Sequence, residues 1–141
     1  MEYTDLYING TWSKGTSGER FDVINPATEE VLASVASADI ADADAALDAA
    51  EAAMKDWAAR TPRQRSEVLR KAWELMTARL DEFAHLITLE NGKARADALG
   101  EATYAAEFFR WFAEEAVRAD GMITHAPASG ARIMVQHKPA G

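Results

Sequence analysis

Between residues 37 and 121, apolar residues recur every three or four positions, which is the spacing of one face of an α-helix. The first stripe, over residues 37–59, consists of Ile40, Ala43, Leu47, Ala50, Met54 and Trp57. Three further stripes follow, separated by helix start and stop signals. The pattern predicts a four-helix segment over residues 37–121.

Short-range signals set the expected starts of the first three helices. Thr61 precedes Pro62, which suits the first helical position, and Gln64 can complete a capping box with Thr61. We expect Ser37 to cap the first helix and Asp81 to cap the third.

The last helix is predicted to have two apolar faces. It follows Asn91-Gly92, a strong stop signal because glycine adopts a left-handed conformation without strain, and it is expected to end at Gly121. The first face consists of Ala98, Ala102, Ala105, Phe109, Phe112 and Ala116, and the second of Tyr104, Phe108 and Trp111. A helix with two apolar faces is usually covered on both sides.

The first 36 residues have the pattern of short strands joined by turns. Asn9-Gly10 lies between apolar residues and predicts a tight type I′ hairpin, because both residues tolerate positive φ. Asn25-Pro26 marks another turn, since proline lacks an N–H and disfavours helix at the residue before it. We therefore predict an antiparallel β-meander over residues 1–36.

Residues 122–141 are predicted to be a loop followed by one terminal strand, residues 132–137. The sequence leaves the partner of this strand open. The strand pairs with the N-terminal meander, with another chain, or with protein outside these 141 residues.

Composition narrows the classes of partner. The chain is 48% apolar and 27% charged, with a net charge of −8 at pH 7. Nucleic acids and anionic membranes attract a basic face, so we expect neither as a partner. No apolar run approaches the length of a membrane span, and the N-terminus lacks the pattern of a signal peptide. The absence of cysteine excludes a thiol nucleophile within the chain and is typical of a cytoplasmic protein.

Residue spacing alone reveals no catalytic or metal-binding set. His85, His125 and His137 lie far apart and lack companions at ligand spacing, and the glycine motifs of nucleotide-binding loops are absent. Glu114 and Arg118 are expected to form an ordinary surface ion pair on the last helix. By this evidence the chain is an α-rich domain with a β-meander and an unpaired strand.

Five motifs nevertheless occur in a familiar order across essentially the whole chain, at residues 6–12, 23–31, 89–93, 112–116 and 137–141. Together they resemble the N-terminal portion of the aldehyde dehydrogenase superfamily. The sequence of residues 111–116 is most similar to that of the succinate-semialdehyde dehydrogenase branch. The resemblance implies an α/β family fold, of which this chain holds the N-terminal part. It also implies that the helices of residues 37–121 belong to a nucleotide-binding domain.

Members of that family oxidise aldehydes to carboxylic acids with NAD or NADP, using a cysteine thiolate, an oxyanion hole and a glutamate that activates water. In the family these groups, and the cofactor's glycine-rich loop, lie beyond the position where this sequence ends. We therefore assign no catalytic or cofactor-binding residue, and expect the chain alone to be inactive and to bind neither NAD nor NADP tightly.

For the full-length enzyme, the resemblance implies a cytoplasmic homo-oligomer that acts on an aldehyde, with succinic semialdehyde as the candidate substrate. Residues 132–137 match a strand of the oligomerisation sheet in this family.

Two lesser sites follow from the same resemblance. The backbone carbonyls of Val23 and Ile24 and the carboxylate of Glu90 match a monovalent-cation site, for which oxygen ligands are suitable. Many relatives have aspartate in place of Glu90, and the extra methylene changes its reach. Tyr104 and Phe108 match the helix face that lines the aldehyde entrance, although core packing is the favoured interpretation for Phe108.

The alternative interpretation is a non-catalytic helical interaction module derived from the same fold. A reading frame that continues past Gly141 towards a later cysteine favours the enzyme fragment. A natural stop codon together with stable, soluble expression favours the module.

Overall fold

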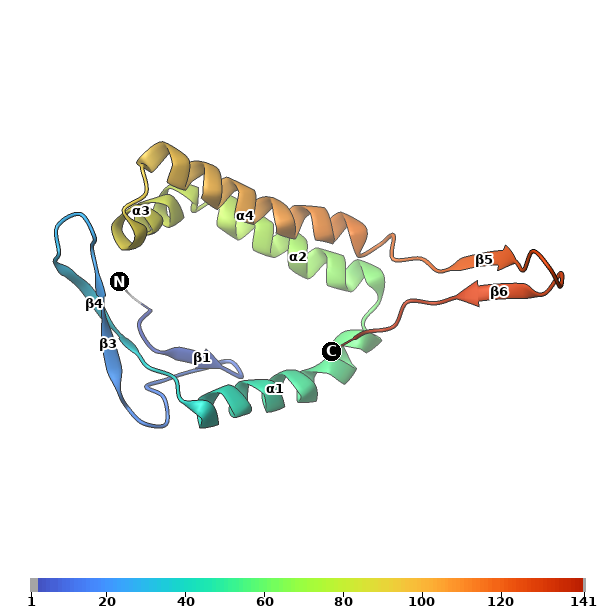
Figure 1. The fold of residues 1–141 in the computed structure, drawn as a ribbon, viewed down its shortest axis with the longest axis horizontal. Helices are drawn as coiled ribbons and strands as arrows, with labels where there is room; N and C mark the ends of the chain where they lie inside the picture. Colours follow the sequence, from blue (N-terminus) through green and yellow to red (C-terminus); the bar gives the residue numbers. More distant parts are fainter. Residues whose placement is uncertain (1–2, 141) are drawn as a thin grey trace.

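A computed structural model describes residues 3–140, which contain four helices and three antiparallel strand pairs (Figure 1). In chain order the elements are β1 (Leu6–Ile8), β2 (Thr11–Ser13), β3 (Arg20–Ile24), β4 (Val31–Ala36), α1 (Ile40–Ala59), α2 (Pro62–Thr77), α3 (Leu80–Asn91), α4 (Arg95–Glu115), β5 (Met122–His125) and β6 (Arg132–Val135). The predicted four-helix segment is therefore confirmed, whereas the arrangement of the strands differs from the prediction.

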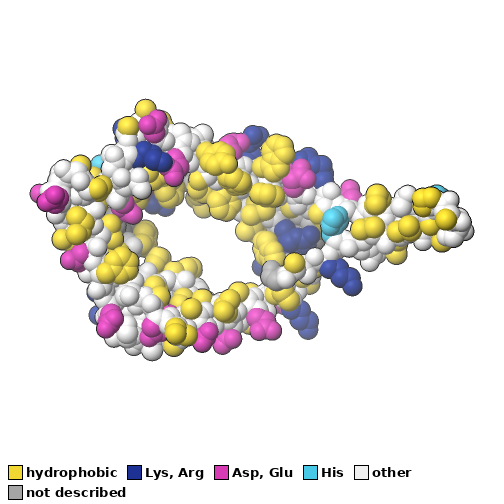
Figure 2. Space-filling view, viewed as in Figure 1, with side chains coloured by type: hydrophobic (Ala, Val, Ile, Leu, Met, Phe, Trp, Pro, Cys, Tyr) yellow, Lys and Arg dark blue, Asp and Glu magenta, His cyan; other side chains and the backbone are white. Residues whose placement is uncertain are grey.

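Helices α2, α3 and α4 form the packed part of the molecule, with α4 lying along both α2 and α3 (Figure 1). The central cluster combines buried alanines with larger, partly buried side chains, namely Ala84, Ala98 and Ala102 with Leu80, Phe83 and Ile87. α1 lies apart from these helices. Together with them and the N-terminal hairpins it forms a ring, and Figure 2 shows that the centre of this ring remains open when side chains are drawn. No helix within residues 3–140 has the length and apolar character to cross a bilayer.

The inward face of α4 is made of small residues. Ala98, Ala102, Ala106 and Ala113 are buried, and their spacing keeps them on one side of the helix. Alanine lets a neighbouring helix approach closely, so the bulky side chains of α4 point elsewhere. Of the first predicted apolar face, Ala98 and Ala102 are buried, whereas the side chains of Phe109 and Phe112 are exposed in this chain.

α4 ends at Glu115 and not at Gly121 as predicted. The Arg118 amide donates to the Glu115 carbonyl at 2.8 Å, which tightens the last turn. Gly121 is required by the following hairpin, since a Cβ there would lie 2.2 Å from the Val135 carbonyl oxygen. The glycine therefore permits close approach of two strands and does not end the helix.

The N-terminal strands form two separate hairpins, β1–β2 and β3–β4, and not the single meander predicted. The φ angles of Asn9 and Gly10, 50° and 77°, agree with the expected tight turn between β1 and β2. After β2 the chain turns away at Gly15, whose φ is 81°, so β2 and β3 do not pair. The hairpins remain connected, because the Ala36 amide donates to the Thr4 carbonyl at 2.8 Å.

α1 begins after Asp39 and not after Ser37. The Asp39 carboxylate accepts from the Asp42 amide at 3.1 Å, and the Asp42 carboxylate accepts from the Asp39 amide at 3.0 Å, which completes a capping box. Ser37 is held in the strand connection instead, where its amide donates to the Glu19 carbonyl at 2.8 Å.

Asp42 also joins the start of α1 to the loop after β2. Its carboxylate accepts from the Thr16 amide at 3.0 Å and from the Thr16 hydroxyl at 2.8 Å. These bonds, with that from the Asp39 amide the foremost, lower the pKa of Asp42. Gly15 allows this contact, since a Cβ on it would lie 3.2 Å from the Asp42 carboxylate. The Asp42 carboxylate therefore connects the start of α1 to the loop that follows the β1–β2 hairpin.

The other helix starts agree with the predictions only in part. The capping box of α2 is confirmed, with the Gln64 amide 3.3 Å from the Thr61 hydroxyl. No side chain caps α3, which begins at Leu80, so the predicted cap at Asp81 is wrong. Asp81 lies within the first turn, and its carboxylate accepts from the Arg95 guanidinium at 2.8 Å.

β5 occupies a segment that was predicted to be loop. It pairs antiparallel with β6, from Met122 opposite Val135 to His125 opposite Arg132, so the terminal strand has a partner in its own chain. Alternation of apolar side chains along β5 is too short to have distinguished it from a loop. Every residue of the two strands is exposed, and the hairpin projects away from the helices (Figure 1).

Replacing Asp42 with asparagine should destabilise the fold at neutral pH, because a neutral amide is a poorer acceptor for the three donors that converge there. The lowered folded-state pKa sets the sign of the pH dependence. The stabilisation is complete above the unfolded-state pKa of about 3.9 and is lost as the pH falls through the folded-state value. Thermal unfolding followed by circular dichroism should therefore show a wild-type advantage that shrinks in acid.

Asp48→Asn, at an exposed position of the same helix, is the matched control and should change the unfolding temperature little. Equal effects of the two substitutions at neutral pH would contradict the role of Asp42.

Candidate functional site

A cluster of aromatic side chains lies on α4 on the side that its buried alanines do not occupy. We call Tyr104, Phe108, Trp111 and Phe112 the aromatic face of α4. The ring centroids of Tyr104 and Phe108 are 4.9 Å apart in an edge-to-face arrangement, and those of Phe108 and Phe112 are 6.5 Å apart. With Glu107, these four residues line a shallow groove of about 340 Å³.

The aromatic face of α4 is open to solvent. Tyr104 is 66% exposed, Phe108 47% and Trp111 60%. The core-packing interpretation favoured for Phe108 is therefore wrong for this chain. Figure 2 shows hydrophobic side chains on the surface along the helices. A contiguous apolar patch of this kind marks a surface that contacts other protein or a ligand.

The predicted cation ligands lie on two different elements. Val23 and Ile24 are in β3, at a shift of register against β4. Glu90 is near the end of α3 and lines a groove of about 340 Å³ with Tyr3 and His85. Among residues 3–140, no hydrogen bond or ion pair connects Glu90 to β3, and no three His, Cys, Asp or Glu side chains gather into a metal site. The cation site remains a prediction.

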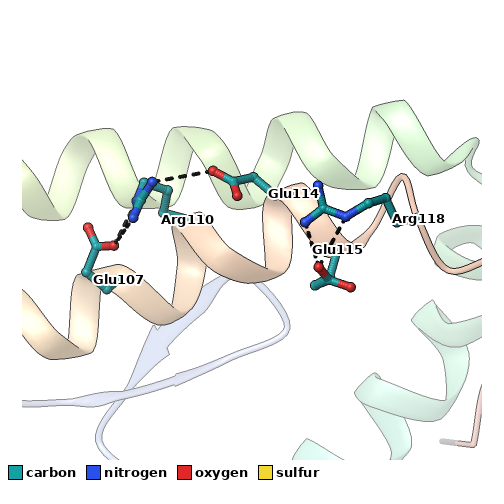
Figure 3. Close-up of polar contacts among 5 residues, drawn as sticks. All are labelled: Glu107, Arg110, Glu114, Glu115 and Arg118. Carbon is teal, nitrogen blue, oxygen red and sulfur yellow. Dashed lines mark hydrogen bonds and ion pairs between the residues drawn. The ribbon is translucent and has the colours of Figure 1, made fainter.

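A network of ion pairs follows α4 (Figure 3). Arg110 lies between Glu107 and Glu114 and pairs with both, at N–O distances of 2.6 and 3.5 Å. Arg118 pairs with Glu115 at 2.6 Å, so the predicted pair between Glu114 and Arg118 is wrong. The reason is that α4 ends at Glu115, which places Arg118 in the turn beyond the helical path.

The Arg110 guanidinium also sets the protonation of Glu107. Its hydrogen bond, foremost, and its charge lower the pKa of Glu107, and Trp73 of α2 adds a smaller effect in the same direction. These contacts favour the carboxylate form of Glu107. The glutamates three residues before and four residues after Arg110 are the sequence signal for this network, which the prediction of a Glu114–Arg118 pair missed.

Residues 12–141 match the sequence profile described as the aldehyde dehydrogenase family. The chain is 53% identical over 111 residues to a succinate-semialdehyde dehydrogenase of Paenarthrobacter nicotinovorans, an alignment that covers 79% of this chain and 25% of that protein. It is 41% identical over 134 residues to the succinate-semialdehyde dehydrogenase [NADP(+)] of Escherichia coli K12, covering 95% of this chain and 28% of the relative.

Solved structures give the same result. A crystal structure of an E. coli NADP-dependent enzyme superposes with a TM-score of 0.87 at 40% identity, covering 93% of this chain and 27% of that one. A succinate-semialdehyde dehydrogenase from Burkholderia pseudomallei superposes with a TM-score of 0.86 at 38% identity, over 92% of this chain and 27% of that one.

The fold is thus that of part of an aldehyde dehydrogenase-like α/β enzyme. The profile match covers far more than half of the sequence, and the chain belongs to the aldehyde dehydrogenase family. It spans about a quarter of the length of the relatives that it matches.

The exposed aromatic face of α4 should make this chain self-associate, because burying apolar surface against a second copy removes it from water. Replacing both Phe108 and Trp111 with serine should move the elution volume on a sizing column towards that of a monomer. The same substitutions should reduce binding of a dye that reports apolar surface.

Leu75→Ser removes an exposed apolar side chain from α2 and serves as the control, which should alter neither readout. A wild-type chain that is strictly monomeric and does not bind the dye would contradict the prediction.

Proposed function

We propose that this chain is the N-terminal part of an NAD(P)-dependent aldehyde dehydrogenase that oxidises succinic semialdehyde to succinate. The observation that carries the proposal is the similarity along nearly the whole chain to semialdehyde dehydrogenases, at 41% identity over 134 residues with the E. coli relative. The glutarate-semialdehyde dehydrogenase of Pseudomonas putida is 42% identical over 135 residues, so a five-carbon semialdehyde is the second candidate substrate.

In such an enzyme, this chain and the remainder of the protein would contribute different groups to the reaction. Bound NAD or NADP supplies the acceptor for the hydride. A thiolate nucleophile cannot come from these residues, because the sequence contains no cysteine. The chain therefore contributes support and access rather than reacting groups.

Access is the role we propose for Tyr104 and Phe108. Their edge-to-face rings form an apolar wall on one side of α4, and their exposure leaves them free to line an aldehyde entrance formed with further protein. Such a wall guides the aldehyde and excludes water from the path to the reacting atoms.

The division of the chain also belongs to this proposal, with residues 1–36 and 122–141 flanking a helical segment, 37–121, of the nucleotide-binding domain. We propose that the β5–β6 hairpin joins a homo-oligomer of the whole enzyme. Support comes from the exposure of every residue of both strands and from the projection of the hairpin away from the helices (Figure 1). A cytoplasmic location and a monovalent cation held by Val23, Ile24 and Glu90 are further parts of the proposal.

A chimera tests the proposed function directly. The corresponding segment of the E. coli succinate-semialdehyde dehydrogenase is replaced with this chain, and NADPH formation from succinic semialdehyde is followed by absorbance. We expect turnover within about tenfold of the parent enzyme, because the relative is 41% identical over 134 residues. The 141-residue chain alone should give no turnover.

A folded chimera without activity would contradict the proposal and favour a non-catalytic interaction module. Sedimentation of the same chimera reports whether it assembles into an oligomer as the parent does.

A further inference from the structure

A second groove lies between α2 and the C-terminal half of α4. Its volume is about 400 Å³, and it shares no lining residue with the aromatic face of α4. Its charged lining residues are Arg63, Glu67, Arg70, Arg110, Glu114 and Arg118. Four arginines against two glutamates make this groove locally basic in a chain whose net charge is −8.

Two of these arginines are already neutralised by carboxylates. Arg70 pairs with the glutamates three residues before it and four residues after it on α2. Arg110 does the same on α4, as Figure 3 shows. The two glutamates of the groove, Glu67 and Glu114, are each held in one of these pairs, so they oppose an anion only weakly.

The other two arginines keep donors available. Arg63 forms no ion pair within the part of the chain that the structure describes, and it lies in the first turn of α2, where the helix dipole adds positive potential. Arg118 uses Nε and Nη2 for the Glu115 carboxylate. Its Nη1 has no hydrogen-bond partner among residues 3–140.

A serine hydroxyl also lines the groove. Ser66 is 5% exposed as a whole residue, and its hydroxyl makes no hydrogen bond within residues 3–140. This hydroxyl is therefore available to donate to a ligand beside the arginines.

We propose that this groove binds a small anion, with Arg63 and Arg118 contacting a carboxylate or phosphate group and the Ser66 hydroxyl donating to it. Guanidinium groups match the geometry of both anions, and the volume suits a small metabolite better than a dinucleotide. The site is separate from the aromatic face of α4 and does not depend on the proposed dehydrogenase activity.

Titration of the full 141-residue chain with succinate, and separately with inorganic phosphate, tests the site by calorimetry and by amide chemical shifts. We expect saturable binding of at least one anion, with shifts concentrated at Ser66 and its neighbours in α2. Arg63→Gln should weaken binding roughly tenfold, the loss expected for one charged hydrogen bond. Ser66→Ala should weaken it by a smaller factor without changing the far-ultraviolet circular dichroism.

Lys71→Gln is the matched control, since it removes the same charge from α2 outside the groove. Saturation by succinate alone identifies the ligand class as a carboxylate, and saturation by phosphate alone identifies it as a phosphate. No saturable binding of either anion, or equal weakening by Arg63→Gln and Lys71→Gln, would overturn the proposal.

Discussion

The close approach of α4 to α2 and α3 is the constraint on which the rest of this structure depends. Alanines at positions 98, 102, 106 and 113 form the inward side of α4, and no other residue type with a Cβ lets helices pack so closely. Because the small residues take the inside, the large aromatic residues of the same helix are directed outwards. The packing of the alanine face of α4 therefore produces both the interior between the helices and the exposed apolar surface on the other side of α4.

This arrangement explains why the chain is open in shape. Within residues 3–140, the buried apolar residues are all alanines and no large side chain is completely buried. α1 keeps its apolar stripe exposed, with Ile40 82% and Leu47 68% accessible, and it is anchored at its start chiefly through the hydrogen bonds of Asp42. Local hydrogen bonds and ion pairs hold the elements in place, while large apolar side chains stay exposed. In the family to which this chain belongs, relatives are about four times as long.

Local chemistry was predictable from the sequence, and the direction of packing was not. The capping box at Thr61, the turn at Asn9 and the left-handed Gly92, with a φ of 73°, all depend on residues within a few positions of one another. By contrast, periodicity showed that α4 has apolar residues on several sides but not which side faces its neighbours. Two further features were missed because contacts with other residues decided them. The Ser37 amide bonds to Glu19, so the cap of α1 falls at Asp39, and Arg118 pairs with Glu115 in place of Glu114.

The central claim is that the aromatic face of α4 is covered by protein outside this chain. Hydroxyl-radical footprinting, read by mass spectrometry at Tyr104, Phe108 and Trp111, measures this most directly when the chain alone is compared with the chimera that contains the rest of the E. coli relative. The account predicts strong modification in the chain and a decrease of about tenfold in the chimera, as expected for side chains that pass from exposed to buried. Equal modification of these three residues in both proteins would contradict it.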